Sequence, residues 1–255
     1  MRQNKASRLL AFCMGILLIG ALIQAAGWLK GDRLVFPGVG EILRAFFRLL
    51  GAPKTWMQIG TTLCHLLQSL AVSTLVGTAL GLAEGASDFI RDLLRPLMTL
   101  LRSIPMIVLV VIIMVLMKYR YVPIVATSLI LIPMISEATA EGMRQIEPEY
   151  LDVYRMNSGI NGQVIFRVYL PLMAGYLRQA YVNAVGMGLR LTVSTEYLVQ
   201  TTDSLGKAVN TSSYFNEYAD IYGYALIMIL LVVLVTELPE WFFRLRRTKM
   251  SFGKS

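Results

Sequence analysis

The sequence predicts an all-α integral membrane protein with about six transmembrane helices and with both termini in the cytoplasm. Three observations lead to this fold class: the composition, the length of the apolar runs, and the charges at the ends of those runs. Of the 255 residues, 56% are hydrophobic and only 16% are charged, and the mean hydropathy is +0.59. Soluble domains carry about 25% charged residues, so this composition favours a membrane protein.

Six apolar runs are long enough to cross a bilayer as helices, which takes about 20 residues each. They cover residues 9–29, 59–84, 94–117, 121–140, 170–197 and 221–243. The first run follows Arg2, Lys5 and Arg8, as in a signal peptide. It is longer than a signal-peptide core and ends in a poor cleavage site, so we expect a retained anchor. Residues 38–50 are too short to span the bilayer and predict an interfacial amphipathic helix.

The positions of the basic residues predict how the spans are oriented. The net charge is +8, but the Lys and Arg residues are scattered and gather at the ends of apolar runs, which argues for lipid contact and against nucleic-acid binding. The basic tail that directly follows Trp241, Phe242 and Phe243 places the C-terminus in the cytoplasm. We therefore divide the chain into an anchor region (1–34), a transmembrane domain (35–245) with a cytoplasmic loop at about 141–171, and a basic tail (246–255).

Several prolines stand inside apolar runs or at their edges, namely Pro105, Pro123, Pro133 and Pro171. Each proline removes a backbone donor and is expected to kink or break its helix. A membrane protein tolerates such breaks where neighbouring helices or a water-filled cavity satisfy the freed backbone groups. Broken helices of this kind favour a transport pathway.

The loop at 141–171 has the pattern of a short, structured helix in water. Pro148 suits a first helical turn, and Glu149 and Asp152 are acids near the positive helix N-terminus. Four apolar and polar residues recur at helical spacing and form one face of the predicted helix. Ser158 with Gly159 is expected to end this helix. The face consists of Tyr150, Val153, Tyr154 and Asn157. A connection of about 30 residues is far longer than two neighbouring spans need, so we expect it to bind a partner.

This loop resembles the cytoplasmic Glu-Ala-Ala loop of ATP-binding cassette (ABC) importer permeases. The family pattern is Glu-Ala-Ala, three residues, Gly, nine residues, Ile, one residue and Leu-Pro. The segment 152–154 stands at Glu-Ala-Ala, Ser158 at Gly, Val168 at Ile, and Leu170 with Pro171 at Leu-Pro. The spacing is kept, but the small residues of the pattern are replaced by bulkier ones, which implies a specific partner ATPase.

Further short motifs resemble permeases of the nitrate, sulfonate and taurine type, and the resemblance covers about residues 35–245. The matching segments are 36–38 with 41–43, His65 with 69–70, 101–105, Thr195 with Glu196, and 204–206. Val72 stands where many members of this type have Arg. These motifs are short, so their order and spacing carry the resemblance.

The resemblance implies the type I importer permease fold and a subunit that moves substrate without hydrolysing ATP. The implied partners are ABC ATPase subunits, a second permease subunit (a second copy or a paralogue) and an extracytoplasmic substrate-binding protein, in a bacterial cytoplasmic membrane. The implied substrate is a small organic or anionic solute, such as a sulfonate, nitrate or a vitamin precursor. We expect no cofactor on this chain, since ATP and Mg²⁺ would bind the ATPase and the chain has no complete phosphate-binding loop. The seven residues expected to contact the ATPase are Glu149, Tyr150, Asp152, Val153, Tyr154, Ser158 and Gly159.

Four charged or ionisable residues inside the predicted spans are candidates for the substrate pathway, because such residues usually face the bundle interior or a cavity. They are His65, Arg102, Arg190 and Glu196. Each also has a structural interpretation: Arg102 at a membrane surface, His65 in helix packing, and Arg190 or Glu196 in a pair with a second subunit. Cys13 and Cys64 are expected to be buried, and neither has metal-ligand spacing.

Three other classes remain open from the residues alone. A proton-coupled secondary transporter would use Glu196 as its proton site, but the structured loop would then have no role. A membrane-embedded enzyme lacks a nucleophile–base pair or metal constellation in this sequence, which has a single His. A scaffold of the energy-coupling type of vitamin importer fits the loop but not its spacing to Leu170 and Pro171.

Overall fold

A computed structural model describes residues 14–15, 37–145 and 169–251, and beyond residue 236 it describes the backbone only. Within these ranges the regular elements are helices. They are α2 (Val39–Gly51), α3 (Pro53–Ala86), α4 (Asp88–Ser103), α5 (Met106–Leu116), the 3₁₀ turn η1 (Tyr119–Tyr121), α6 (Val122–Arg144), α9 (Leu170–Val199), α10 (Leu205–Tyr214) and α11 (Tyr218–Ser251). The predicted all-helical fold is confirmed for the described residues.

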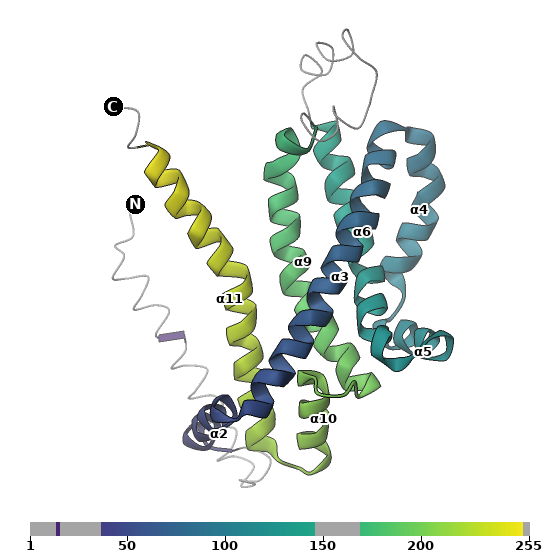
Figure 1. Cartoon of the computed structure of the whole chain (residues 1–255). Coiled ribbons are helices and arrows are strands. Elements are labelled where there is room, and N and C mark those ends of the chain that lie inside the picture. Colours follow the sequence, from purple (N-terminus) through teal and green to yellow (C-terminus); the bar gives the residue numbers. More distant parts are fainter. Residues whose placement is uncertain (1–13, 16–36, 146–168, 252–255) are drawn as a thin grey trace.

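The long helices α3, α6 and α9 run side by side and define two ends of the bundle (Figure 1). At the α4 end, α3 finishes, α4 begins, α6 finishes and α9 begins. At the α10 end lie α2, α10 and the first turn of α11. The segment that joins α6 to α9 therefore leaves and re-enters the bundle at the α4 end.

The most extensive helix contact among the described residues is between α3 and α6, and glycines on α3 let the two backbones come close. A Cβ atom on Gly81 would lie 2.4 Å from Ser136 O and 2.6 Å from Thr139 Cβ. A Cβ on Gly77 would lie 2.9 Å from Ile135 Cβ. Gly77, Gly81 and Gly85 follow one another at four-residue spacing, so they form a single stripe that lets the two backbones approach, as small residues do in membrane helix pairs.

Several hydroxyl groups of α3 and α6 bond to backbone carbonyls inside the bundle. Ser69 Oγ donates to His65 O at 2.8 Å, and Thr139 Oγ1 donates to Ile135 O at 2.8 Å. Ser128 Oγ reaches Ser69 O across the α3–α6 interface at 3.3 Å. A buried polar group without a partner is costly in lipid, so this pairing lets α3 and α6 carry polar side chains through the core.

The span predicted at 94–117 is broken in the structure, as the proline at position 105 predicted. Two helices, α4 and α5, replace it, and they meet at an angle of 102°. The break lies at Ile104 and Pro105, both extended. Pro105 lacks an N–H and disfavours helical geometry in the residue before it, so α4 ends at Ser103. By contrast, Pro133 lies inside α6 without ending it, and Pro123 and Pro171 occupy the first turns of α6 and α9.

The count of six spans remains a prediction. The described chain has three helices that are long and apolar enough to cross a membrane, or four when the bent pair α4–α5 counts as one span. The helix α9 covers the predicted span at 170–197 in length but not in apolarity. The anchor predicted at 9–29 lies outside the described residues. The orientation of the termini likewise stays a prediction.

Three local expectations have different outcomes. The short amphipathic helix expected at 38–50 is present as α2, whose Gly38 N–H bonds to the Glu41 carboxylate at 3.0 Å. The helix α10 was not expected. Cys64 was expected to be buried but is exposed on α3, so that expectation was wrong.

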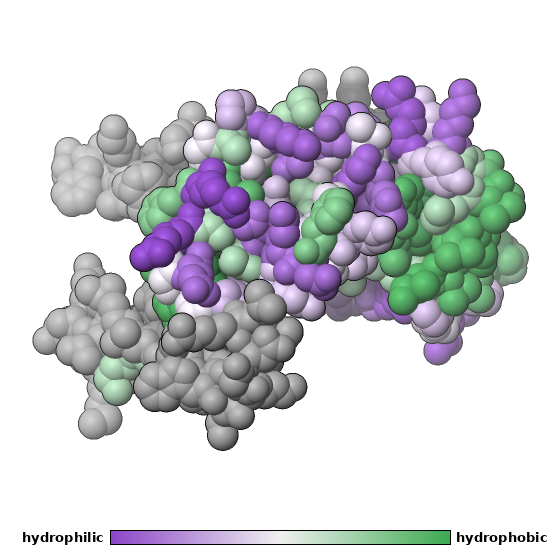
Figure 2. Space-filling view, turned by 90° about the horizontal axis from the view of Figure 1, so that it is seen from below, coloured by the Kyte–Doolittle hydropathy of each residue, from purple (hydrophilic) through white to green (hydrophobic). Residues whose placement is uncertain are grey.

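The surface of the α10 end is divided into a polar part and an apolar part (Figure 2). Hydrophilic side chains gather over the middle of this view, and a strongly hydrophobic area lies at the edge where α5 is found. On α5, Ile107, Val111 and Val115 are 63%, 54% and 83% exposed. In a membrane protein such a face contacts lipid or another subunit.

The α3–α6 contact predicts how two glycine substitutions in the same helix will differ. Gly81→Ala should lower the melting temperature of the detergent-solubilised protein, because overpacking typically costs about 1–3 kcal/mol. Gly60→Ala is the matched control, since nothing lies within 4 Å of the added methyl group. It should leave the melting temperature unchanged or raise it slightly. Equal melting temperatures for the two variants would contradict the close contact.

Candidate functional site

The structure brings two of the four candidate pathway residues together and places the other two apart. His65 and Glu196 are in contact, whereas Arg102 lies in a charged cleft between α4 and α6, and Arg190 lies between α9 and α11. The seven residues expected to contact an ATPase all lie outside the described residues: Glu149, Tyr150, Asp152, Val153, Tyr154, Ser158 and Gly159.

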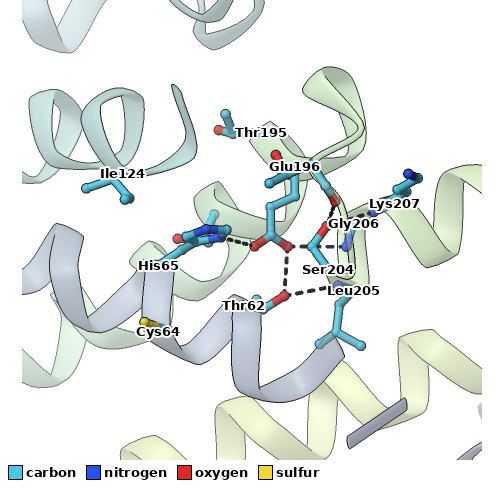
Figure 3. A network of polar contacts seen from close by, with 12 residues as sticks. Thr62, Cys64, His65, Ile124, Thr195, Glu196, Ser204, Leu205, Gly206 and Lys207 are labelled. Atoms are coloured by element: carbon cyan, nitrogen blue, oxygen red, sulfur yellow. Dashed lines mark hydrogen bonds and ion pairs between the residues drawn. The ribbon is translucent and has the colours of Figure 1, made fainter. Parts of the chain in front are cut away.

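Glu196, which is fully buried, is the centre of a polar network near the α10 end (Figure 3). On one carboxylate oxygen, Oε1, it accepts a bond from His65 Nδ1 at 2.8 Å. On the other, Oε2, it accepts from Thr62 Oγ1 at 2.8 Å and from the Gly206 N–H at 3.3 Å. The network therefore ties together α3, α9 and α10.

The first turn of α10 is built to meet this carboxylate. Ser204 caps the helix by accepting from the Lys207 N–H at 3.2 Å, and the Leu205 N–H donates to Thr62 Oγ1 at 3.0 Å. Backbone N–H groups at a helix N-terminus have no partner inside the helix and carry partial positive charge, so they suit a carboxylate. A Cβ on Gly206 would lie 2.4 Å from Tyr197 N, so only glycine lets α10 come this close to α9.

The Glu196 network stabilises the packing of three helices and does not face a cavity in this conformation. Glu196 has no exposed surface, and the side chain of His65 is 12% exposed. A buried carboxylate is tolerated when hydrogen bonds satisfy it, as they do here. The pathway role of His65 and Glu196 thus stays a prediction that requires another conformation of α10.

Arg102 joins α4 to α6 at the deep end of the charged cleft. Its Nη2 lies 2.8 Å from Glu137 Oε2 and donates to Pro133 O at 3.1 Å. The side chains of Arg102 and Glu137 are 45% and 64% exposed, so this pair lies in an open cleft and not in a sealed core. The pathway role of Arg102 and its alternative placement at a membrane surface therefore both stay predictions.

Arg190 is an exposed cation on α9 beside an apolar cleft of about 440 Å³. The opposite wall of this cleft comes from α11, including Ala225, Met228 and Val232. Within the part of the chain that the structure describes, Arg190 makes no hydrogen bond or ion pair. Its proposed pairing with a second subunit is therefore still a prediction.

A second polar cleft, of about 230 Å³, lies at the α10 end, and the sequence analysis did not identify it. Residues from α3, the loop before α10, α10 and α11 line it, among them Lys54, Asp203, Lys207 and Glu217. Beside it, Asp220 on α11 forms an ion pair with Arg48 on α2. The charged residues Asp203, Lys207, Glu217 and Asp220 in a largely polar segment could have indicated a polar surface, but α10 was needed to bring them together.

The fold and these clefts describe a helical membrane protein with polar clefts near both ends of its bundle. The model of the family described as binding-protein-dependent transport system inner membrane component matches residues 73–251. This match covers more than half of the chain, so the chain belongs to that family and is a permease component of an ABC importer. No curated protein matches the sequence.

A solved structure shares the fold. The chain is similar to a chain of the MetNI methionine ABC transporter in an inward-facing crystal form, with a TM-score of 0.62. The sequences are 17% identical, and the match covers 74% of this chain and 92% of that one. At this identity the likeness concerns the fold alone. The earlier resemblance to importer permeases is thereby confirmed at the level of the family, and the nitrate, sulfonate and taurine type remains a prediction.

The Glu196 network predicts a graded response to substitution. Glu196→Ala removes the acceptor for three donors, each of which costs about 1–3 kcal/mol when buried without a partner, so the melting temperature should fall by several degrees. Glu196→Gln keeps one carbonyl oxygen and should cause a smaller loss. Glu217→Ala, an exposed acid on the same side of the bundle, serves as the control and should have no effect. If Glu196→Ala melts like the control, the network does not hold α10.

Proposed function

We propose that this chain is the transmembrane permease subunit of an ABC importer that moves a small organic or anionic solute by alternating access. A separate ATPase supplies the energy, and an extracytoplasmic binding protein delivers the solute and largely sets the specificity. A second permease subunit, either another copy of this chain or a paralogue, completes the pathway. The match of the family model to residues 73–251 carries this proposal, because it runs from the middle of α3 to the end of α11.

The geometry of the bundle supports a division of labour between its two ends. The segment between α6 and α9, which holds the seven expected ATPase contacts, begins and ends at the α4 end (Figure 1). The polar cleft and the helices α2 and α10 lie at the opposite end, where a binding protein would dock. This arrangement agrees with a cytoplasmic α4 end and an extracytoplasmic α10 end.

Co-purification tests the ATPase contact directly. The chain is co-expressed with the ATPase encoded next to it, and the amount of ATPase retained is measured for the unchanged chain and for Asp152→Ala combined with Tyr154→Ala. Truncating two interface residues typically weakens binding at least tenfold, so the double variant should lose the ATPase. The matched control is Thr211→Ala combined with Ser213→Ala, two exposed residues of α10 at the opposite end, which should retain it. No retention by the unchanged chain would overturn the proposal.

Energy coupling provides an independent measurement in membrane vesicles. Uptake should stop when the partner ATPase carries an inactivating substitution, and it should continue when an uncoupler removes the proton gradient. The opposite result, uptake that survives the inactive ATPase and stops with the uncoupler, is the outcome that a proton-coupled transporter gives. That outcome would favour the alternative function, a proton-coupled transporter with Glu196 as its proton site.

A further inference from the structure

The helix α4 has one apolar face and one charged face. Phe89, Leu93 and Leu97 are exposed at four-residue spacing, with exposed fractions of 75%, 62% and 47%, and Leu100 continues this stripe. Arg91, Arg95 and Arg102 lie on the opposite side of the helix and line the charged cleft. When a helix in a membrane domain carries three arginines on one face, that face must contact either water or negatively charged groups.

The charged cleft has a volume of about 450 Å³ and opens near the α4 end. One wall is α4, the other is α6, and Glu84 from the end of α3 contributes to the lining. Arginines and acids are equal in number in the lining: Arg91, Arg95, Arg102 and Arg144 against Glu84, Asp92, Glu137 and Glu141. The net charge of the lining therefore predicts no preference for anions over cations, and the ligand preference depends on which of these side chains already have partners.

Every acid in the charged cleft has a donor or a counter-charge. Ser136 Oγ donates to Glu84 Oε1 at 3.1 Å, and Gln145 Nε2 donates to Glu141 Oε1 at 2.9 Å. Glu137 is paired with Arg102, and Asp92 lies 3.8 Å from Arg91 Nε. The carboxylates of the cleft are thus already engaged by groups of the protein.

Two of the four arginines are not engaged. Arg91 pairs with Asp88 at 3.0 Å as well as with Asp92, and Arg102 holds Glu137 and Pro133 O. The guanidinium groups of Arg95 on α4 and Arg144 on α6, by contrast, make no hydrogen bond or ion pair within the described part of the chain, although the Arg95 carbonyl accepts from Thr99 Oγ1 at 2.8 Å. Each guanidinium offers five N–H donors in a planar fork that fits an oxyanion. The two unpaired guanidinium groups in the cleft therefore lack acceptor oxygens, and a bound anion between the two walls would supply them.

We infer that the charged cleft binds an oxyanion, namely a sulfonate, phosphate or carboxylate group, with Arg95 and Arg144 as the binding residues. This inference rests on the proposed function, because it takes α4 to be a wall inside the membrane domain. The oxyanion has two possible sources with the same chemistry, a soluble anion in the passage or the headgroup of an anionic lipid. Charge-assisted bonds from both walls would hold α4 and α6 at a fixed separation around it.

Chemical modification of a thiol introduced into the cleft tests the inference. Thr99→Cys lies on the cleft face of α4, in a background of Cys13→Ser and Cys64→Ser, with the full chain in phosphatidylcholine nanodiscs. The anionic reagent sulfonatoethyl methanethiosulfonate and the cationic reagent trimethylammonioethyl methanethiosulfonate are compared by their reaction rates. The anionic reagent should be favoured. Adding Arg95→Gln with Arg144→Gln should reduce that preference about fivefold, because two positive charges are lost near the thiol.

Two controls make this measurement specific. Leu97→Cys on the apolar face of α4 should react slowly with both reagents, since methanethiosulfonates need water and a thiolate. Lys118→Gln with Arg120→Gln removes the same net charge after α5 and should leave the preference intact. Arg95→Lys with Arg144→Lys keeps both charges and should keep the preference, which separates loss of attraction from misfolding.

Protection experiments then distinguish the sources of the oxyanion. If soluble ethanesulfonate slows the reaction at position 99 in phosphatidylcholine discs, the site takes a soluble anion. If the reaction slows only when phosphatidylglycerol is in the disc, the site takes a lipid headgroup, and the oxyanion site again stands. No protection by either, or a preference that survives the Gln variants, would overturn the inference. The ATPase is absent from these measurements, so they can fail or succeed independently of co-purification.

Discussion

The close approach of α3 and α6 is the contact on which the rest of the bundle depends. Gly77, Gly81 and Gly85 remove the side chains that would hold the two backbones apart, and the shortest contact is made with Ser136 and Thr139. In lipid there is little hydrophobic driving force between apolar helices, so such packing and interhelical hydrogen bonds supply the attraction. Helices α3 and α6 together form the surface against which α9 and α4 pack.

The charged groups of this membrane domain are accommodated in two different ways. Near the α10 end, Glu196 is sealed among donors from three helices, so its charge serves packing. Near the α4 end, Arg102 and Glu137 are paired but open to a cleft, and the Arg95 guanidinium has no partner within the described chain. The carboxylate of Glu196 is therefore enclosed by hydrogen bonds, whereas the arginines of the charged cleft are accessible from outside the bundle. This asymmetry suits a protein with different partners on its two sides.

The sequence predicted those features that depend on local patterns. The apolar runs gave α3, α6, α9 and α11 because span length and hydrophobicity are local, and the amphipathic pattern gave α2 for the same reason. The break at Pro105 was signalled by the proline, but its angle depends on packing. The contact between His65 and Glu196 joins residues 131 positions apart, so no spacing rule could reveal it. The cap at Ser204 and the four-residue glycine repeat on α3 are local signals, but the contacts that they allow with α9 and α6 depend on the tertiary packing.

The turn between α4 and α5 also limits how much of the bilayer thickness this part of the chain can match. At 1.5 Å per residue, the 16 residues of α4 reach about 24 Å, less than the hydrocarbon core of about 30 Å. Beyond Pro105 the chain changes direction, because α5 is turned by 102° relative to α4 and carries exposed valines and isoleucines. Acyl chains beside α5 must therefore shorten or splay to cover it, at a cost for each ångström of mismatch. The protein thus carries a local sensitivity to acyl-chain length on one side of its circumference.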